Sequence, residues 1–266
     1  MERFNNKKIL LSFLIAIPFF FGGFIPNETM MPAFRMKKIV LDAGHGGKDP
    51  GNLGSRSKEK DINLAVTLLV GKYIKENMPD VEVIYTRDDD SFPELKKRPQ
   101  IANNNKADLF VSIHSNSAPN KSAYGTETFV MGTKNFEANF DIVKKENSVI
   151  LLEENHEEEY EGFDPTSPES YIMFNLMSKA NFTNSVTLAD HIETQFRDRV
   201  GRKSRGVKQA PLWVLWTTSM PSVLVEVGFL SNSTEEQFLM TKQGQEYMAS
   251  AIYRSIKQYK EEIEAN

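Results

Sequence analysis

The chain has 266 residues, a formal net charge of −4 at pH 7 and no cysteine. A nucleic-acid partner is not expected, because no basic stripe offsets the negative charge of phosphates. The lack of cysteine excludes disulfides, thiolate zinc sites and a cysteine nucleophile. Any metal ion must therefore be bound by histidine, aspartate and glutamate.

Residues 1–34 differ in composition from the rest of the chain. Arg3, Lys7 and Lys8 precede a largely apolar run over 9–21, which is the layout of a secretory signal. The run is marginal for a membrane span, since a span takes about 20 apolar residues. We expect export, with the segment removed as a signal peptide or kept as an anchor. The periplasm is the expected compartment, and secretion into the medium stays open.

Residues 35–266 are expected to form one domain, the catalytic one. Short β-branched runs alternate with segments whose apolar residues recur at helical spacing. This order predicts an α/β fold with a mostly parallel, twisted sheet flanked by helices. The predicted strands are 38–42, 81–86, 108–114, 126–131, 212–215 and 222–227, and the predicted helices are 61–77, 94–104, 185–200 and 244–261.

Residues 136–184 form an insertion within this domain. A stretch of about 50 residues is too long for an ordinary loop, so we expect it to carry structure or regulation. It contains an acidic run over 153–161 and an apolar patch over 171–177.

Two histidines follow predicted strands. His45 lies in a glycine-rich loop after the first strand, and His114 ends the strand 108–114. Open α/β sheets carry their chemistry at the carboxyl ends of strands. Glu59, just before the helix 61–77, can converge with both if the two strands are neighbours. Two histidines and one glutamate are a known catalytic zinc set, although each residue alone is more often structural or solvated.

Glu226 lies within the apolar run 223–230. Burying an unpaired charge is costly, so this carboxylate needs a partner or a function. The alternative to a buried ion pair is a general base whose pKa is tuned by burial and by a metal, and we favour the base.

The two other histidines and three arginines are not expected to take part in the site. His156 in the acidic run and His191 on the helix 185–200 are expected to be ordinary residues. Arg87, Arg98 and Arg205 are expected on helix faces or in ion pairs rather than as substrate clamps.

Four motifs together resemble the zinc-dependent N-acetylmuramoyl-L-alanine amidases of the cell-division type, the amidase 3 family. They are LDAGHGG at 41–47, EKDINLA at 59–65, SIHSN at 112–116 and PSVLVEVGFLSN at 221–232. The resemblance runs in order from about residue 38 to 259.

The resemblance implies a peptidoglycan hydrolase with one Zn²⁺ per chain. Its zinc ligands fall on His45, Glu59 and His114, and its catalytic glutamate falls on Glu226. The reaction implied is cleavage of the amide between N-acetylmuramic acid and L-alanine of the stem peptide, by zinc-activated water with a glutamate base. The implied roles are cell-wall remodelling and separation of daughter cells.

The segment 136–184 resembles an insertion that covers the active site of division amidases until an activator protein displaces it. This implies autoinhibition and an activator in the envelope, with an acidic residue of 153–161 approaching the zinc. A solvated acidic face is the alternative. We expect a monomer.

Three other functions stay open from the residues alone. One is a different zinc hydrolase of wall material, such as a carboxypeptidase or deacetylase, which would share the ligands. Another is a silent peptidoglycan-binding protein, which an intact Glu226 argues against. A purely structural zinc site is disfavoured because such sites usually have four protein ligands, and the sequence offers three.

Overall fold

A computed structural model describes residues 34–176 and 181–265 of the chain. The segment predicted as a signal or anchor lies outside the described residues, apart from Phe34. Among the described residues, no helix combines the length and apolar character that a membrane crossing demands.

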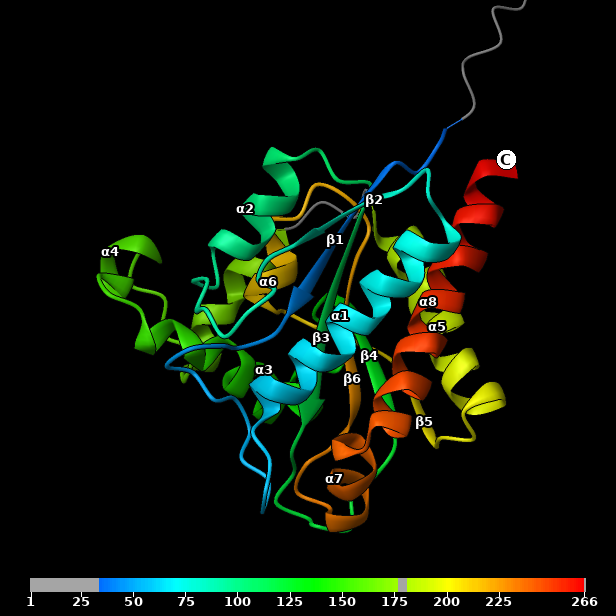
Figure 1. Ribbon diagram of the computed structural model, residues 1–266. Coiled ribbons are helices and arrows are strands. Elements are labelled where there is room, and N and C mark those ends of the chain that lie inside the picture. The colour runs from blue at the N-terminus through cyan, green and yellow to red at the C-terminus, as the bar shows by residue number, and fades with distance from the viewer. Residues whose placement is uncertain (1–33, 177–180, 266) are drawn as a thin grey trace, which may run out of the picture. The chain divides into compact units, whose positions relative to one another are not determined.

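The centre of the described part is a six-stranded sheet with the order β2-β1-β3-β6-β4-β5 (Figure 1). Strands β2, β1, β3 and β6 are parallel to one another, and β4 pairs antiparallel with β6 and parallel with β5. The predicted α/β fold with a mostly parallel sheet is therefore confirmed. The strands are β1 (Lys38–Ala43), β2 (Glu82–Tyr85), β3 (Leu109–Asn116), β4 (Thr126–Met131), β5 (Ser204–Ala210) and β6 (Ser222–Phe229).

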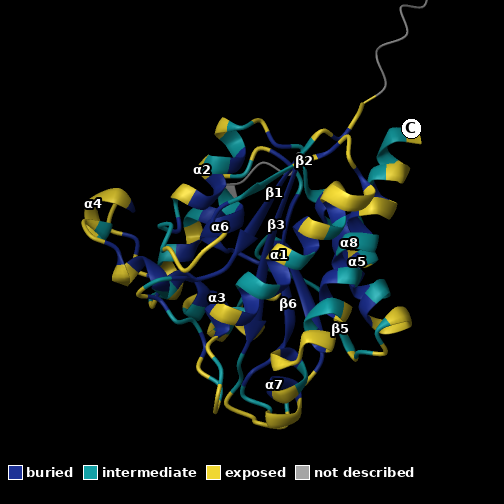
Figure 2. Ribbon diagram, viewed as in Figure 1, coloured by how far each residue is buried: buried dark blue, intermediate teal, exposed yellow. Residues whose placement is uncertain are grey.

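Helices cover both faces of the sheet, as Figures 1 and 2 show. Alternate residues of a strand point to opposite faces, so Leu41 of β1 packs into one apolar core and Val40 into the other. The first face carries α1 (Glu59–Asn77), α5 (Phe182–Arg199) and α8 (Lys242–Ala265), with α7 (Ser233–Met240) at the end of β6; the second carries α2 (Lys97–Asn104), α3 (Phe136–Asn147) and α6 (Trp213–Trp216).

The predicted strand over 212–215 is wrong, because this segment forms the short helix α6. A short apolar run cannot be assigned to strand or helix by periodicity alone. The strand β5 was not predicted, since its sequence SRGVKQA is mostly polar. Its position at the edge of the sheet explains this composition, because an edge strand is only partly covered.

The insertion 136–184 carries structure, as expected. After α3 come the 3₁₀ helix η1 (Ser148–Leu152), the short helix α4 (His156–Glu159) and the 3₁₀ helix η2 (Pro168–Leu176). Its aromatic rings contact one another and the two tryptophans of α6, with centroid separations of 4.6–5.9 Å. Aromatic pairs at such separations stabilise packing beyond their buried area. The insertion is thereby held on the second face of the sheet.

Candidate active site

The loop after β1 places the first candidate ligand. His45 has a φ of 62° and Gly46 a φ of 131°, so the chain turns sharply; a non-glycine residue in the left-handed region stores strain that is common at functional sites. A Cβ at Gly44 would collide with the ring of His114. Glycine at this position therefore lets the two imidazoles approach, and their ring centroids lie 4.9 Å apart.

Two buried arginines donate hydrogen bonds to the backbone of this loop. Arg87 donates to the carbonyl oxygens of Ala43 and Gly44, and Arg98 donates to the carbonyl oxygen of His45 at 2.9 Å. The expectation that these arginines are not substrate clamps fits these contacts, because their guanidinium groups are used on the backbone.

Glu59 is the first residue of α1 and is fully buried. Its carboxylate accepts from the backbone N–H groups of Asn52 and Ser115 at 2.8 and 2.9 Å, and from the Asn63 amide at 3.1 Å. A carboxylate at a helix N-terminus is also stabilised by the helix dipole. The solvated-charge interpretation of Glu59 is therefore wrong.

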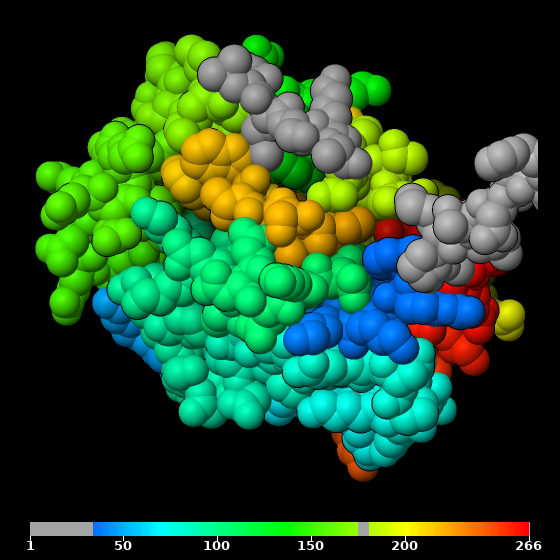
Figure 3. Space-filling model, turned by 90° about the horizontal axis from the view of Figure 1, so that it is seen from above, coloured from blue at the N-terminus to red at the C-terminus, as the bar shows by residue number. Residues whose placement is uncertain are grey.

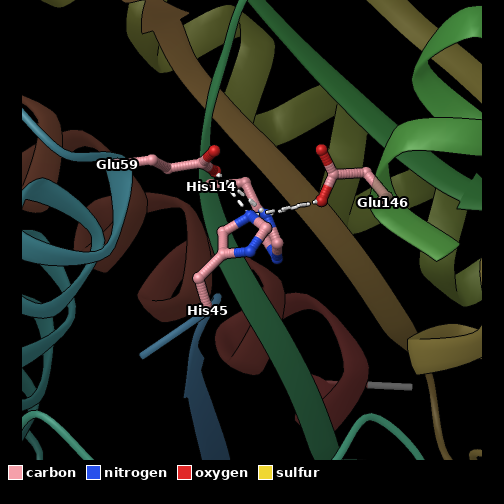
Figure 4. Close-up of side chains that lie close together, drawn as sticks. All are labelled: His45, Glu59, His114 and Glu146. Carbon is pink, nitrogen blue, oxygen red and sulfur yellow. Dashed lines mark hydrogen bonds and ion pairs between the residues drawn. The ribbon is translucent and has the colours of Figure 1, made fainter. Parts of the chain in front are cut away.

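His114 lies near the end of β3, beside β1, so the two strand-end histidines meet as expected. A fourth buried side chain, Glu146 from α3, joins them and Glu59 (Figure 4). Nε2 of His45 lies 3.2 Å from Oε1 of Glu59 and 3.6 Å from Oε2 of Glu146. Nδ1 of His114 lies 3.2 and 2.9 Å from the same two oxygens.

Three of these four separations, at 3.2–3.6 Å, are close to those around a tetrahedral zinc ion, and the fourth, 2.9 Å from Nδ1 of His114 to Oε2 of Glu146, is shorter. Zinc–ligand distances of about 2.0–2.2 Å imply ligand–ligand distances of about 3.3–3.6 Å. In the described part of the chain, Nε2 of His45 and both oxygens of Glu146 are buried without a hydrogen-bond partner. Such atoms call for an explanation, and a shared metal ion supplies one.

The other ring nitrogen of His45 is oriented by a carboxylate. Its Nδ1 lies 2.6 Å from Oδ2 of Asp49, which is itself largely buried. A carboxylate in this position fixes the tautomer that presents Nε2 to a metal. Sequence reasoning did not identify Asp49, although its spacing four residues after the histidine is a usable signal.

Both histidines have strongly perturbed pKa values in the absence of a metal. Burial lowers the pKa of His45, but Glu59 and Asp49 outweigh it and raise the pKa to about 10. For His114, burial is likewise outweighed by Glu146 and Glu59, which raise the pKa to about 10. The cluster therefore holds protons where a cation would otherwise bind.

Glu146 is the candidate metal ligand that sequence reasoning missed. The acidic residue at the cluster was expected within 153–161, and that expectation is wrong. The missed signal is the apolar face of α3, which continues through Phe136, Phe140 and Val143 and reaches Glu146 at helical spacing. A carboxylate on the buried face of an amphipathic helix needs a partner.

The run 153–161 instead fastens the insertion to the start of α2. Glu153 accepts from the backbone N–H of Leu95 at 2.6 Å and from the hydroxyl of Tyr160 at 2.7 Å. Glu159 pairs with Lys96 at 3.2 Å. Figure 3 shows the insertion, in green, against the blue-green residues that precede and form α2.

Glu226 is fully buried on β6, in register with His114 on β3. Neither of its carboxylate oxygens has a hydrogen-bond partner among the described residues, so the buried ion pair considered as an alternative is not formed there. Burial raises the pKa of Glu226 well above its usual range, and the negative charges of Glu146 and Glu59 raise it further. This environment suits a group that accepts and returns a proton.

The two remaining histidines lie away from the cluster. His191 pairs with Glu262 at 2.8 Å, and Nδ1 of His156 lies 3.1 Å from the carbonyl oxygen of Glu153. Arg205 forms an ion pair with the buried Glu127.

Comparison with known proteins gives consistent matches. The family model described as N-acetylmuramoyl-L-alanine amidase matches residues 39–258. The amidase AmiA of Escherichia coli is 33% identical over 225 residues, covering 83% of this chain and 75% of AmiA. The solved catalytic domain of CwlV, an N-acetylmuramoyl-L-alanine amidase from Bacillus (Paenibacillus) polymyxa var. colistinus, is 33% identical with a TM-score of 0.63, covering 84% of this chain and 98% of that domain. The CwlD amidase of Clostridioides difficile, solved in complex with the GerS lipoprotein, is 30% identical with a TM-score of 0.60, covering 84% and 98%.

Proposed function

Since the chain belongs to the family of N-acetylmuramoyl-L-alanine amidases, we propose that it hydrolyses peptidoglycan at a zinc ion held by His45, Glu59 and His114. The bond cleaved is the amide between N-acetylmuramic acid and L-alanine of the stem peptide. The observation that carries this assignment is the buried cluster of ligand atoms with Glu226 in register beside it. Three of the four donor separations are close to those around tetrahedral zinc, which supports the choice of metal.

Glu226 is the proposed general base and acid. When bound, zinc supplies Lewis acidity, which activates water and polarises a carbonyl oxygen. Glu226 takes a proton from the attacking water and returns it to the leaving amide nitrogen of L-alanine. Its raised pKa favours holding that proton between the two steps.

Asp49 and Asn63 act as positioning residues in this proposal. Asp49 fixes the tautomer of His45, and Asn63 donates to Oε1 of Glu59 while its side-chain oxygen accepts from the hydroxyl of Ser115. These contacts hold the ligands in place before the metal arrives, so little ordering accompanies metal binding.

The structure, in which Glu146 of α3 lies at the cluster, corresponds to a closed, latent enzyme in this proposal. Catalytic zinc sites keep an open position for water, whereas structural sites have four protein ligands. Glu146 supplies the fourth ligand and so fills the position that water needs. Because α3 belongs to the insertion, displacing this helix opens the site.

A partner that moves α3 is part of the same proposal. The structure of CwlD with the GerS lipoprotein gives a precedent for a bound protein in a relative. We expect such an activator to meet this chain in the envelope, after export directed by residues 1–34. The periplasm remains the proposed compartment, and cell separation the proposed setting.

Digestion of purified peptidoglycan tests the function. The products of the full chain, with and without a chelator, are identified by mass spectrometry beside those of Glu226→Gln. We expect free stem peptides beginning with L-alanine, lost on chelation, restored by zinc and absent for the variant. Cleavage within the stem peptide or at an acetyl group would replace the amidase assignment with another zinc hydrolase. No product from the full chain or from Glu146→Ala would favour a binding protein.

A further inference from the structure

A pair of cations on the edge strand β5 reaches toward the catalytic glutamate. Arg205 and Lys208 both contact the carboxylate of Glu127, which is buried on β4. Glu127 lies directly opposite Glu226 in the antiparallel pairing of β4 with β6. Residues opposite each other in such a pair share a face, with Cβ atoms about 4.5–5.5 Å apart. The cation pair therefore lies on the same face as the site.

A bulge in β5 brings both cations to this face. Thr126 pairs with Ser204 and Thr128 with Val207, so two residues of β5 oppose one of β4. On a regular strand, side chains three positions apart point to opposite faces of the sheet. The extra residue of the bulge brings Arg205 and Lys208, which are three positions apart, onto the same face. Gly206 occupies the bulge with a φ of 83°, where other residues are strained.

The pair keeps binding capacity that the protein does not use. Only Nε of Arg205 bonds to Glu127, at 2.9 Å, and its two terminal nitrogens have no hydrogen-bond partner within the described ranges. Its side chain is 32% exposed and that of Lys208 is 27% exposed. Two cations on one carboxylate leave one positive charge in excess.

The pair is also held in a defined place. The guanidinium carbon of Arg205 lies 5.0 Å from the centroid of the Phe229 ring. The Asn116 amide donates to the other oxygen of Glu127 at 2.6 Å, which ties the pair to β3 two residues after His114. An arginine oriented on one side and free on the other can bind a carboxylate with its terminal nitrogens.

The spacing of the strands sets which carboxylate fits. Neighbouring strands lie about 4.8 Å apart, so β5 is roughly 9–10 Å from β6 and Glu226. An extended peptide advances about 3.3–3.6 Å per residue, so the second or third residue beyond the cleaved bond reaches this distance.

We propose that Arg205, supported by Lys208 and oriented by Glu127, binds a free carboxylate of the stem peptide on the L-alanine side of the cleaved amide. This subsite rests on the proposed amidase function, and it makes the enzyme prefer acidic stem peptides over amidated ones. Arg205 is thereby a specificity residue, contrary to the expectation from sequence that it serves in an ion pair rather than as a substrate clamp.

Paired substrates test the proposal. Two muramoyl dipeptides that differ only in a free carboxylate or a carboxamide on the second residue are compared, together with a matched pair of tripeptides differing at the third. The full chain carries Glu146→Ala, so that the fourth ligand position is open. Arg205→Gln, Lys208→Gln and the conservative Arg205→Lys are measured in this background. Arg197→Gln is the control, because Arg197 is exposed on α5 and pairs only with Asp198 among the described residues.

The expected result is a preference for the free carboxylate of about tenfold or more in kcat/KM, in at least one substrate pair, from the loss of a charge-assisted hydrogen bond. Arg205→Gln removes this preference, because it lowers kcat/KM on the free-carboxylate substrate more than on the amidated one. Arg205→Lys restores part of it, and the control retains all of it. An unchanged preference in both Arg205→Gln and Lys208→Gln overturns the proposal. The proposal is also overturned if the Glu146→Ala parent, with Arg205 and Lys208 intact, shows no preference between the paired substrates.

A binding measurement separates this proposal from the amidase function. The same peptides are titrated calorimetrically into the Glu146→Ala chain with Glu226→Gln added, with and without Arg205→Gln. If no substrate is hydrolysed, the proposed function fails, and the subsite is judged by binding alone. Weaker binding of only the free-carboxylate peptide to Arg205→Gln supports the subsite. Equal binding overturns it.

Discussion

Replacing Glu146 with alanine tests whether the closed structure is a latent enzyme. The substitution removes one of the four clustered ligand groups and leaves the three contributed by His45, Glu59 and His114. A contact between a carboxylate and a cationic centre contributes about 1.5–3 kcal/mol, which corresponds to about 10- to 150-fold in the fraction of open sites. We expect basal activity to rise toward the lower end of this range, because the aromatic contacts of α3 remain.

The assay is the rate of stem-peptide release from purified peptidoglycan, followed by chromatography, with the zinc content of each sample measured alongside. Glu137→Ala is the matched control, since Glu137 is an exposed acid on the same helix. We expect one zinc per chain in both variants and activation in Glu146→Ala alone. Equal activity of the two variants at equal zinc content would refute the role assigned to Glu146.

Three other predictions concern the metal and its base. Glu226→Gln retains zinc and loses hydrolysis, by about a hundredfold or more for a lost general base, whereas His114→Ala loses the metal as well; metal analysis beside the activity assay checks both. Asp49→Asn weakens zinc binding by about 10- to 100-fold through the lost support of His45, measured by competition with a chelator; unchanged affinity would contradict this. In the metal-free protein, the pKa values of His45 and His114 are raised from 6.5 to about 10. Their stabilisation is therefore full below about pH 6.5 and lost as the pH rises toward 10, while zinc affinity rises over the same window because metal displaces protons. Denaturant titrations and calorimetry at several pH values measure both trends, and a pH-independent zinc affinity would contradict the second.

The fold was predictable wherever the sequence pattern had one interpretation. Buried strands such as β3 and β6 follow from their β-branched apolar runs, and the long helices α1 and α8 follow from their periodicity. The segment 212–215 has an apolar run too short to separate strand from helix, and tertiary contacts decide it. Asn147 accepts from the backbone N–H of Trp213 at 2.9 Å, so the insertion itself helps to set the conformation of α6.

The candidate site was predictable where strand ends determine position. The convergence of His45, Glu59 and His114 follows from parallel neighbouring strands, although their roles as ligands stay a prediction. Glu146 could not be placed, because its proximity depends on how a whole insertion docks rather than on local spacing. The acidic run 153–161 was the more conspicuous charge, but it docks against α2 instead.

The two attachments of the insertion have different chemistry, and this has consequences for activation. Glu153 is held near α2 by hydrogen bonds that do not involve the candidate metal site, whereas Glu146 lies within that site, 2.9 Å from Nδ1 of His114. If Glu146 binds zinc only when α3 is closed, linkage requires that zinc favours closure by the same factor by which closure favours zinc. An activator that opens α3 must therefore weaken zinc binding by that factor, and zinc must weaken activator binding equally. In Glu146→Ala this coupling disappears while the Glu153 attachment persists, so the activator's affinity no longer depends on zinc.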